Sequence, residues 1–99
     1  MNRLLILPVL LLTLLVGTPA FSADFQKGLT AYKSGDYKTA LREWTPLAEQ
    51  GDADAQANLG ELYRLGHGVP QDYETAVKWF RLGAEQGNAS AQLKLGIMY

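Results

Sequence analysis

The feature that most constrains how this chain can fold is an internal repeat. Shifting the sequence by 36 residues aligns residues 36–63 with residues 72–99 without a gap, and 14 of the 28 aligned positions are identical. A period of this length is typical of proteins that stack one small unit of secondary structure on the next. We therefore expect each copy to bury its apolar face against its neighbours rather than in a core of its own.

Within each copy, apolar residues recur at the spacing of one helical face. Tyr37, Ala40 and Trp44 follow the i, i+3, i+7 spacing, and their counterparts 36 residues later repeat it. No stretch of useful length alternates with a period of two, which argues against strands. The pattern predicts helices over residues 25–33, 37–50, 53–65, 73–86 and 89–99. Because short turns make neighbouring helices antiparallel, the predicted fold class is all-α, an α/α superhelical solenoid of antiparallel helix pairs.

Polar residues and glycines mark the predicted helix ends. Asp36 and Asp72 precede equivalent helices, where a carboxylate accepts hydrogen bonds from the first unpaired backbone N–H groups. A glycine then ends each of these helices, since glycine enters the left-handed conformation without strain, and a further cap starts the next helix almost at once. The glycines are Gly51 and Gly87, and the caps that follow them are Asp52 and Asn88.

Two glycines lie in the middle of predicted helices. Gly60 and Gly96 occupy the same repeat position, where glycine costs about 1 kcal/mol relative to alanine. The same cost in both copies indicates that a neighbouring helix approaches closely at each. Helical spacing also predicts that Trp44 and Phe80 pack in the core and that Trp79 lies at its boundary.

The first 22 residues have the layout of a secretory signal peptide. Arg3 supplies the basic start, and residues 4–16 form an apolar run that rises about 20 Å, too short to cross a bilayer. The small residues Ala20 and Ser22 favour cleavage after Ser22, with cleavage after Ala23 as the alternative. We therefore expect residues 23–99 to be exported, with no membrane span left after cleavage. The periplasm is the expected location, and full secretion stays open.

Composition narrows the chemistry open to the exported part. The whole chain has a formal net charge of -1 and contains no cysteine. Removing the leader, whose one charge is that of Arg3, leaves no basic excess that could neutralise phosphates, so we expect no nucleic-acid partner. The lack of cysteine excludes a disulfide framework, thiolate catalysis and a cysteine zinc site. We expect neither a metal nor a cofactor.

The chain has one histidine, His67, which lies between Gly66 and Gly68. No second histidine or cysteine accompanies it for a metal site, and no serine or carboxylate is predicted to partner it in a triad. The two glycines are explained by a turn that needs positive φ angles. We interpret His67 as an exposed turn residue and predict no catalytic residue, so the chain is not expected to be an enzyme.

Around the turn that contains His67, the sequence resembles the Sel1-like repeat family, a relative of the tetratricopeptide repeats. The residues that carry the resemblance are Ala53, Ala55, Gln56, Leu59, Gly60, Tyr63, Gly66, Gly68, Asp72, Ala76, Trp79 and the run 84–87. Residues 53–87 resemble one complete repeat and residues 89–99 the start of another. Residues 24–51 are more similar to a tetratricopeptide helix pair.

The resemblance implies a scaffold or adaptor that binds a protein or peptide in the bacterial cell envelope. In such arrays the first helix of each pair lines the concave side. Carried over position by position, the residues implied to face a partner are Asp54, Ala57, Glu61, Arg64, Ser90, Leu93 and Ile97.

Two alternatives stay open at this point. Some cysteine-rich Sel1-like proteins carry a β-lactamase or penicillin-binding label, but this chain has no cysteine and neither Ser34 nor Ser90 begins a Ser-x-x-Lys motif. The apolar residues of 89–99 are also short of partners. That shortage suggests a piece of a longer array, self-association through residues 89–99, burial against a partner, or an end that tolerates exposure.

Overall fold

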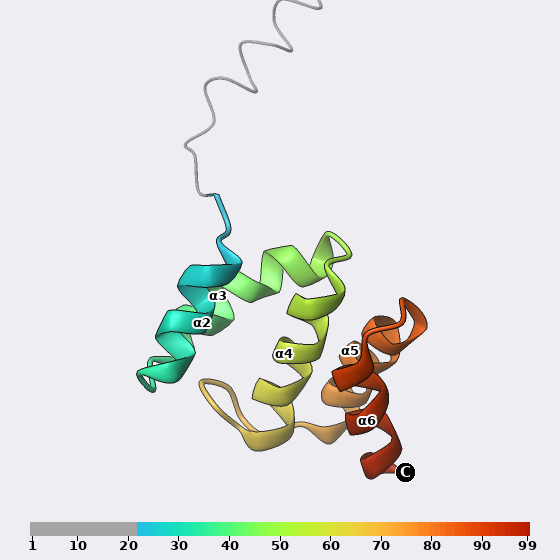
Figure 1. The fold of residues 1–99 in the computed structure, drawn as a ribbon. Coiled ribbons are helices and arrows are strands. Elements are labelled where there is room, and N and C mark those ends of the chain that lie inside the picture. Colours follow the sequence, from blue (N-terminus) through green and yellow to red (C-terminus); the bar gives the residue numbers. More distant parts are fainter. Residues whose placement is uncertain (1–21) are drawn as a thin grey trace, which may run out of the picture.

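A computed structural model describes residues 22–99, and the predicted signal peptide lies almost wholly outside this range. The described residues form five helices: α2 (Phe25–Lys33), α3 (Tyr37–Glu49), α4 (Ala53–Leu65), α5 (Tyr73–Glu85) and α6 (Ala89–Met98). Each predicted helix matches an observed one to within one residue at either end. The helices pack in sequential pairs (Figure 1), which confirms the all-α repeat fold.

The predicted caps are confirmed, and they explain why the helices begin where they do. The backbone N–H of Thr39 donates to the Asp36 carboxylate at 3.2 Å, and that of Thr75 donates to Asp72 at 3.1 Å. Asp52 and Asn88 accept equivalent bonds at the starts of α4 and α6. Each cap satisfies one backbone donor that the helix itself leaves unpaired.

Two clusters of buried residues hold the helices together, and each is built around one large aromatic ring. The first joins α2, α3 and α4 and consists of Ala31, Ala40, Trp44, Ala48, Ala55, Leu59 and Leu62. The second joins α4, α5 and α6 and consists of Ala57, Ala76, Phe80 and Ala91. Trp44 and Phe80 are both fully buried, and Trp79 packs half-buried against the first cluster, as predicted. Because α4 contributes to both clusters, it is the central helix of the stack.

Small residues let the aromatic rings reach the neighbouring helix. A Cβ atom added at Gly28 would lie 2.3 Å from Trp44 Nε1, and one added at Gly60 would lie 2.7 Å from Phe80 Cδ1. The close approach predicted at Gly60 is therefore confirmed. At Gly96 the prediction is wrong, because an added Cβ would meet no atom within 4 Å in the described part of the chain. Among residues 22–99, no helix packs on α6 at Gly96.

The turn between α4 and α5 folds back onto the start of α3. Gly68 has a φ of +81°, and a Cβ added there would lie 3.1 Å from the Tyr37 carbonyl carbon. The His67 ring stacks on the Tyr37 ring with centroids 4.1 Å apart and planes 12° from parallel. The interpretation of His67 as an exposed turn residue is thus wrong. Its ring is half-buried and links the turn to the preceding helix pair.

The Glu43 carboxylate is buried between α3 and the start of α2. It is 1% exposed, and its Oε1 accepts the backbone N–H of Asp24 at 2.9 Å. Its Oε2 lies 3.2 Å from Arg42 Nη2 and 3.8 Å from Lys27 Nζ. Glu43 therefore binds Asp24, the N-cap residue of α2. Its counterpart in the second copy, Trp79, has no carboxylate and cannot bind in this way.

Among residues 22–99, none of the helices combines the length and the apolar character that crossing a membrane requires.

Candidate functional site

Two cavities open at equivalent places in the stack, where the end of one helix pair meets the next. The first has a volume of about 110 Å³ and is lined by Leu29, Tyr32, Trp44, Asn58 and Glu61. The second has a volume of about 310 Å³ and is lined by Arg64, Tyr73, Val77, Ile97 and Met98. The first cavity is lined by residues of α2, α3 and α4 and the second by residues of α4, α5 and α6. They share one position of the 36-residue repeat, Glu61 in the first and Ile97 in the second. We call the two cavities together the groove.

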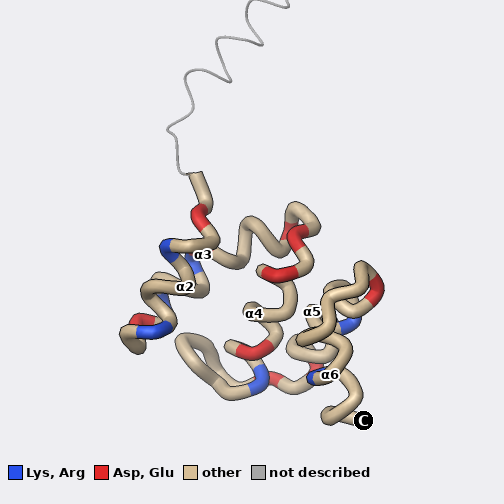
Figure 2. The backbone as a smooth tube through the Cα atoms, viewed as in Figure 1, with Lys and Arg blue, Asp and Glu red and all other residues tan. Residues whose placement is uncertain are grey.

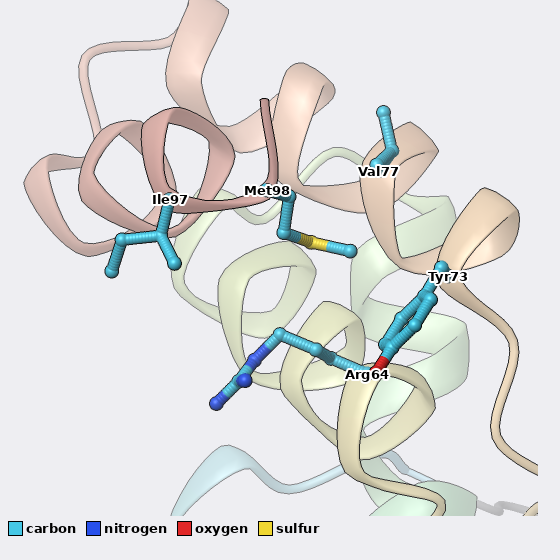
Figure 3. A pocket seen from close by; sticks show the side chains of 5 residues that line it. All are labelled: Arg64, Tyr73, Val77, Ile97 and Met98. Atoms are coloured by element: carbon cyan, nitrogen blue, oxygen red, sulfur yellow. The ribbon is translucent and has the colours of Figure 1, made fainter.

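The larger cavity is mostly apolar, with one cationic side chain at its edge. Figure 3 shows Met98 extending from α6 toward Val77 and Tyr73 of α5, while the Arg64 side chain of α4 runs below Met98 with its guanidinium pointing away from Tyr73 and Val77. Ile97 and Tyr73 are largely exposed, so the cavity is open to solvent. An apolar side chain of a ligand would lose its hydration here, and Arg64 would supply a donor beside it.

An ion cluster separates the two cavities. Arg64 donates to both oxygens of Glu61, from Nε at 3.2 Å and from Nη2 at 2.5 Å. Lys94 of α6 lies 3.5 Å from Glu61 Oε1 and thereby joins α6 to α4. A two-pronged bond of this kind holds the guanidinium in one orientation. Arg64 and Lys94 both keep N–H groups that are not used by Glu61, so these can donate to a ligand.

The electrostatics of the cluster favour its charged form. Burial by itself raises the pKa of Glu61, but the hydrogen bonds and charge of Arg64 and the charge of Lys94 outweigh it, so the pKa of Glu61 is lowered. The hydrogen bond to Glu61 in turn raises the pKa of Arg64. In the first cavity, burial raises the pKa of Tyr32 and the negative charge of Glu61 acts in the same direction. All three groups therefore keep their usual protonation states at neutral pH.

Of the seven residues that were predicted to face a partner, the structure places only some in the groove. Glu61, Arg64 and Ile97 line the groove. Asp54 and Ser90 are exposed but lie outside both cavity linings, and Asp54 accepts a 2.7 Å hydrogen bond from Asn88. Leu93 is 63% exposed and also lies outside the linings.

The prediction that Ala57 faces a partner is wrong. It is 4% exposed because α4 packs against α5 and α6 at this position, within the cluster that surrounds Phe80. A side chain this deeply buried cannot contact a partner. The position-by-position transfer failed here because α4 has helices on both sides, so less of its surface is free than on a helix at the end of a stack.

Sequence reasoning missed most of the groove's apolar lining and one cation of the ion cluster beside it. Tyr73, Val77 and Met98 were assigned to helix faces that meet neighbours, and Lys94 was not singled out at all. The repeat gives a signal only for Lys94, whose counterpart Asn58 lines the first cavity. The counterparts of Tyr73, Val77 and Met98 line neither cavity, so no sequence signal pointed to them.

Metal-ligating and nucleophilic side chains are dispersed over the described residues. Within residues 22–99 no three histidine, cysteine, aspartate or glutamate side chains lie close enough together to hold a metal ion. The Ser34 hydroxyl donates to the Ala31 carbonyl, which leaves it capping α2 rather than near a base. Acidic and basic positions are interspersed along the described helices (Figure 2).

The helix pairs, the shared register and the equivalent cavities define a helical repeat protein of the scaffold type. Comparison with known families agrees with the structure. The Sel1 repeat model matches residues 53–88 and residues 89–99, so this segment is similar to the Sel1 repeat. No curated protein matches the chain significantly.

Proposed function

We propose that this Sel1 repeat scaffold is exported to the bacterial periplasm and binds a segment of a partner protein along the groove. The observation that carries the proposal is the pair of equivalent cavities with the ion cluster between them. Cavities in successive helix groups of a stack suit a ligand that is itself a chain with side chains at intervals.

The chemistry of the groove suggests how such a segment binds. An apolar side chain of the partner fills the larger cavity against Met98, Val77 and Tyr73. The free N–H groups of Arg64 and Lys94 donate to carbonyl or carboxylate oxygens of the same segment. Because packed helices hold these groups in place before binding, little conformational entropy is lost on this side of the complex.

The test uses photo-crosslinking from two positions in the full-length chain expressed in a bacterium. A photoreactive residue at position 73 lies at the mouth of the larger cavity, and one at position 78 lies on a separate surface of α5. We expect one dominant crosslinked protein from position 73 and none from position 78. Equal capture from both positions would move the binding surface away from the groove.

A matched pair of charge deletions sharpens the result. Arg64→Ala removes the cation of the groove, whereas Lys78→Ala removes an exposed cation outside it. We expect the first variant to reduce crosslinking from position 73 about tenfold, as removal of a central interface residue does, and the second to leave it unchanged. No effect of Arg64→Ala would contradict the proposed role of the ion cluster.

Export is tested separately from binding. If residues 1–22 act as a signal peptide, the periplasmic fraction contains a chain that starts at Ala23 or Asp24, as read by intact-mass measurement. A chain of full mass confined to the cytoplasm would overturn the location while leaving the binding groove to be judged by crosslinking.

A further inference from the structure

The first cavity of the groove contains polar side chains that have no hydrogen-bond partner within the protein. Asn58 and Tyr32 both line it, and both are half-buried. Among residues 22–99, no group forms a hydrogen bond with the Asn58 amide or the Tyr32 hydroxyl. The rest of the wall is apolar and comes from Leu29 and from the nearly fully buried Trp44 ring. A ligand in this cavity therefore meets two hydrogen-bonding oxygens beside an apolar surface.

The Glu61 carboxylate also lines this cavity, and it can accept one more hydrogen bond. An ionised carboxylate has about four acceptor positions. Arg64 occupies two of them and Lys94 approaches a third at 3.5 Å, which leaves about one. The contact with Lys94 also shows that this carboxylate accepts an alkylammonium group.

The local charge at the first cavity is negative, although two cations bind Glu61. Burial raises the pKa of the Tyr32 hydroxyl and the charge of Glu61 raises it further, whereas Arg64 lowers it by a smaller amount. At a group that lines the cavity, the carboxylate thus outweighs the guanidinium. A cation is therefore favoured here over an anion.

We propose that the first cavity binds the side chain of a lysine in the partner segment, with its ammonium beside Glu61, Asn58 and Tyr32. This inference rests on the proposed binding of a segment along the groove, and it names the side chain that the smaller cavity takes. An ammonium has three donors and no acceptor, which matches three oxygens that line one cavity. The aliphatic part of the lysine packs on Leu29 and the edge of Trp44.

The cavity fits lysine better than arginine. A guanidinium binds a carboxylate best through two parallel hydrogen bonds, and Arg64 already forms such a pair with Glu61. A single remaining acceptor position suits the point charge of an ammonium. The cavity volume of about 110 Å³ equals that of about four water molecules, enough for one extended side chain.

The second copy of the repeat lacks these groups. The counterpart of Glu61 is Ile97, which lines the larger cavity, and the counterpart of Asn58 is Lys94. The larger cavity therefore takes an apolar side chain where the first takes a cation. Two unlike cavities give the partner segment one preferred direction along the groove.

Neither the predicted leader nor the described helices supply the lysine. Residues 1–21 contain no lysine. Within residues 22–99, none of the lysines lines the first cavity. A lysine from a second copy of the chain is a separate outcome, which the experiment below detects.

The test measures binding of a lysine probe to the chain as purified from the bacterium, by NMR of the Trp44 indole N–H. The probe is N-acetyl-lysine N-methylamide, a lysine between two peptide groups. Its matched control has an acetyl group on the side-chain nitrogen, which removes the charge. We expect saturable binding of the lysine probe and about tenfold weaker binding of the control, because charge-assisted hydrogen bonds are lost.

Three variants locate the binding site. Glu61→Gln removes the charge at constant size and should weaken binding of the lysine probe about fivefold, as for a partly exposed ion pair. Glu49→Gln removes the same charge from an exposed position at the end of α3 and should leave binding unchanged. Asn58→Ala leaves the ion cluster in place and should weaken binding about threefold, the effect of one hydrogen bond. Melting temperatures show whether a variant is folded, and Asn58→Ala keeps the test decisive if Glu61→Gln unfolds.

Four results would overturn the proposal. The first is no saturable binding of the lysine probe, and the second is equal binding of the uncharged control or indifference to both Glu61→Gln and Asn58→Ala. The third is binding of n-butylammonium without binding of the lysine probe, since the ligand would then be a free amine. The fourth is self-association, measured by sedimentation, that Glu61→Gln abolishes, since the lysine would then come from a second copy.

The outcome is independent of the groove experiment. Crosslinking from position 73 reports on a partner at the larger cavity, whereas the lysine probe reports on the first cavity without any partner present. Crosslinking that persists while the probe fails to bind would remove this inference alone. Loss of crosslinking with intact probe binding would remove the partner segment and leave a site for an alkylammonium.

Discussion

The two copies of the repeat, residues 36–63 and 72–99, place the same residues in different surroundings. In the first copy Gly60 lies under the Phe80 ring, and in the second copy Gly96 faces open space. Gln56 is buried and Gln92 is exposed, although both donate to the carbonyl of an alanine in the preceding helix. The difference shows that the function of a repeat residue depends on whether a further helix covers it.

The glutamine pair shows the same effect in hydrogen bonding. Gln56 Nε2 donates to the Ala48 carbonyl at 3.1 Å, and Gln92 Nε2 donates to the Ala84 carbonyl at 3.2 Å. Gln56 also accepts a 2.8 Å bond from Gln86 of the next helix connection. The bond within the copy is therefore repeated, whereas the bond between copies needs a following unit.

The largest expected effect comes from removing the aromatic ring of either copy. Phe80→Ala and Trp44→Ala each delete the largest side chain of a buried cluster and should lower the free energy of unfolding by about 3–5 kcal/mol. Trp44→Ala should be the more costly, since Trp44 Nε1 also donates to the Phe25 carbonyl at 3.2 Å. Urea denaturation of the purified variants measures both. A much smaller loss for either ring would show that its cluster is loosely packed.

The second prediction contrasts the two mid-helix glycines. Gly60→Ala forces a methyl group into the Phe80 ring and should destabilise the chain by about 1–3 kcal/mol. Gly96→Ala meets no atom and should stabilise it by up to about 1 kcal/mol, the difference in helix propensity. Opposite signs in urea denaturation are the expected result. The same sign for both would mean that the second copy is covered in solution.

The third prediction contrasts the two glutamines. Gln56→Ala leaves the buried Ala48 carbonyl without its side-chain donor and should cost about 1–3 kcal/mol. Gln92→Ala exposes the corresponding carbonyl to water and should cost about 0.5 kcal/mol or less, as a surface substitution does. Thermal melts of the two variants provide the comparison, and equal losses would contradict it.

The smallest expected effect is a dependence of the unfolding free energy on pH. It is specific to the first copy, because Glu61 there is replaced by Ile97 in the second copy. The folded chain lowers the pKa of Glu61 below the ordinary value of 4.5, so the ionised form contributes stability above that pH. This contribution is lost as the pH falls through the lowered pKa of the folded state. The difference in unfolding free energy between the native chain and Glu61→Gln should therefore shrink between neutral pH and about pH 3. A difference that stays constant with pH would mean that solvent screens the ion cluster.

Local sequence signals predicted the helices and their ends because the physics behind them is local. A cap such as Asp52 bonds a backbone N–H three residues away, and the helical face of Ala40 and Trp44 is fixed by their spacing. The resemblance to the Sel1-like repeats led to Glu61, Arg64 and Ile97, which line the groove. The 36-residue period by itself thus determined the fold class, and the family resemblance supplied part of the candidate site.

Tertiary structure decided every property that depends on a residue distant in sequence. The His67 ring is packed because the turn folds back on Tyr37, Ala57 is buried because α5 and α6 cover it, and Glu43 binds a backbone group 19 residues earlier. A periodic pattern tells which residues share a face, but it does not tell how many neighbours cover that face. Burial, and with it the division between core and binding surface, is set by the packing of whole helices.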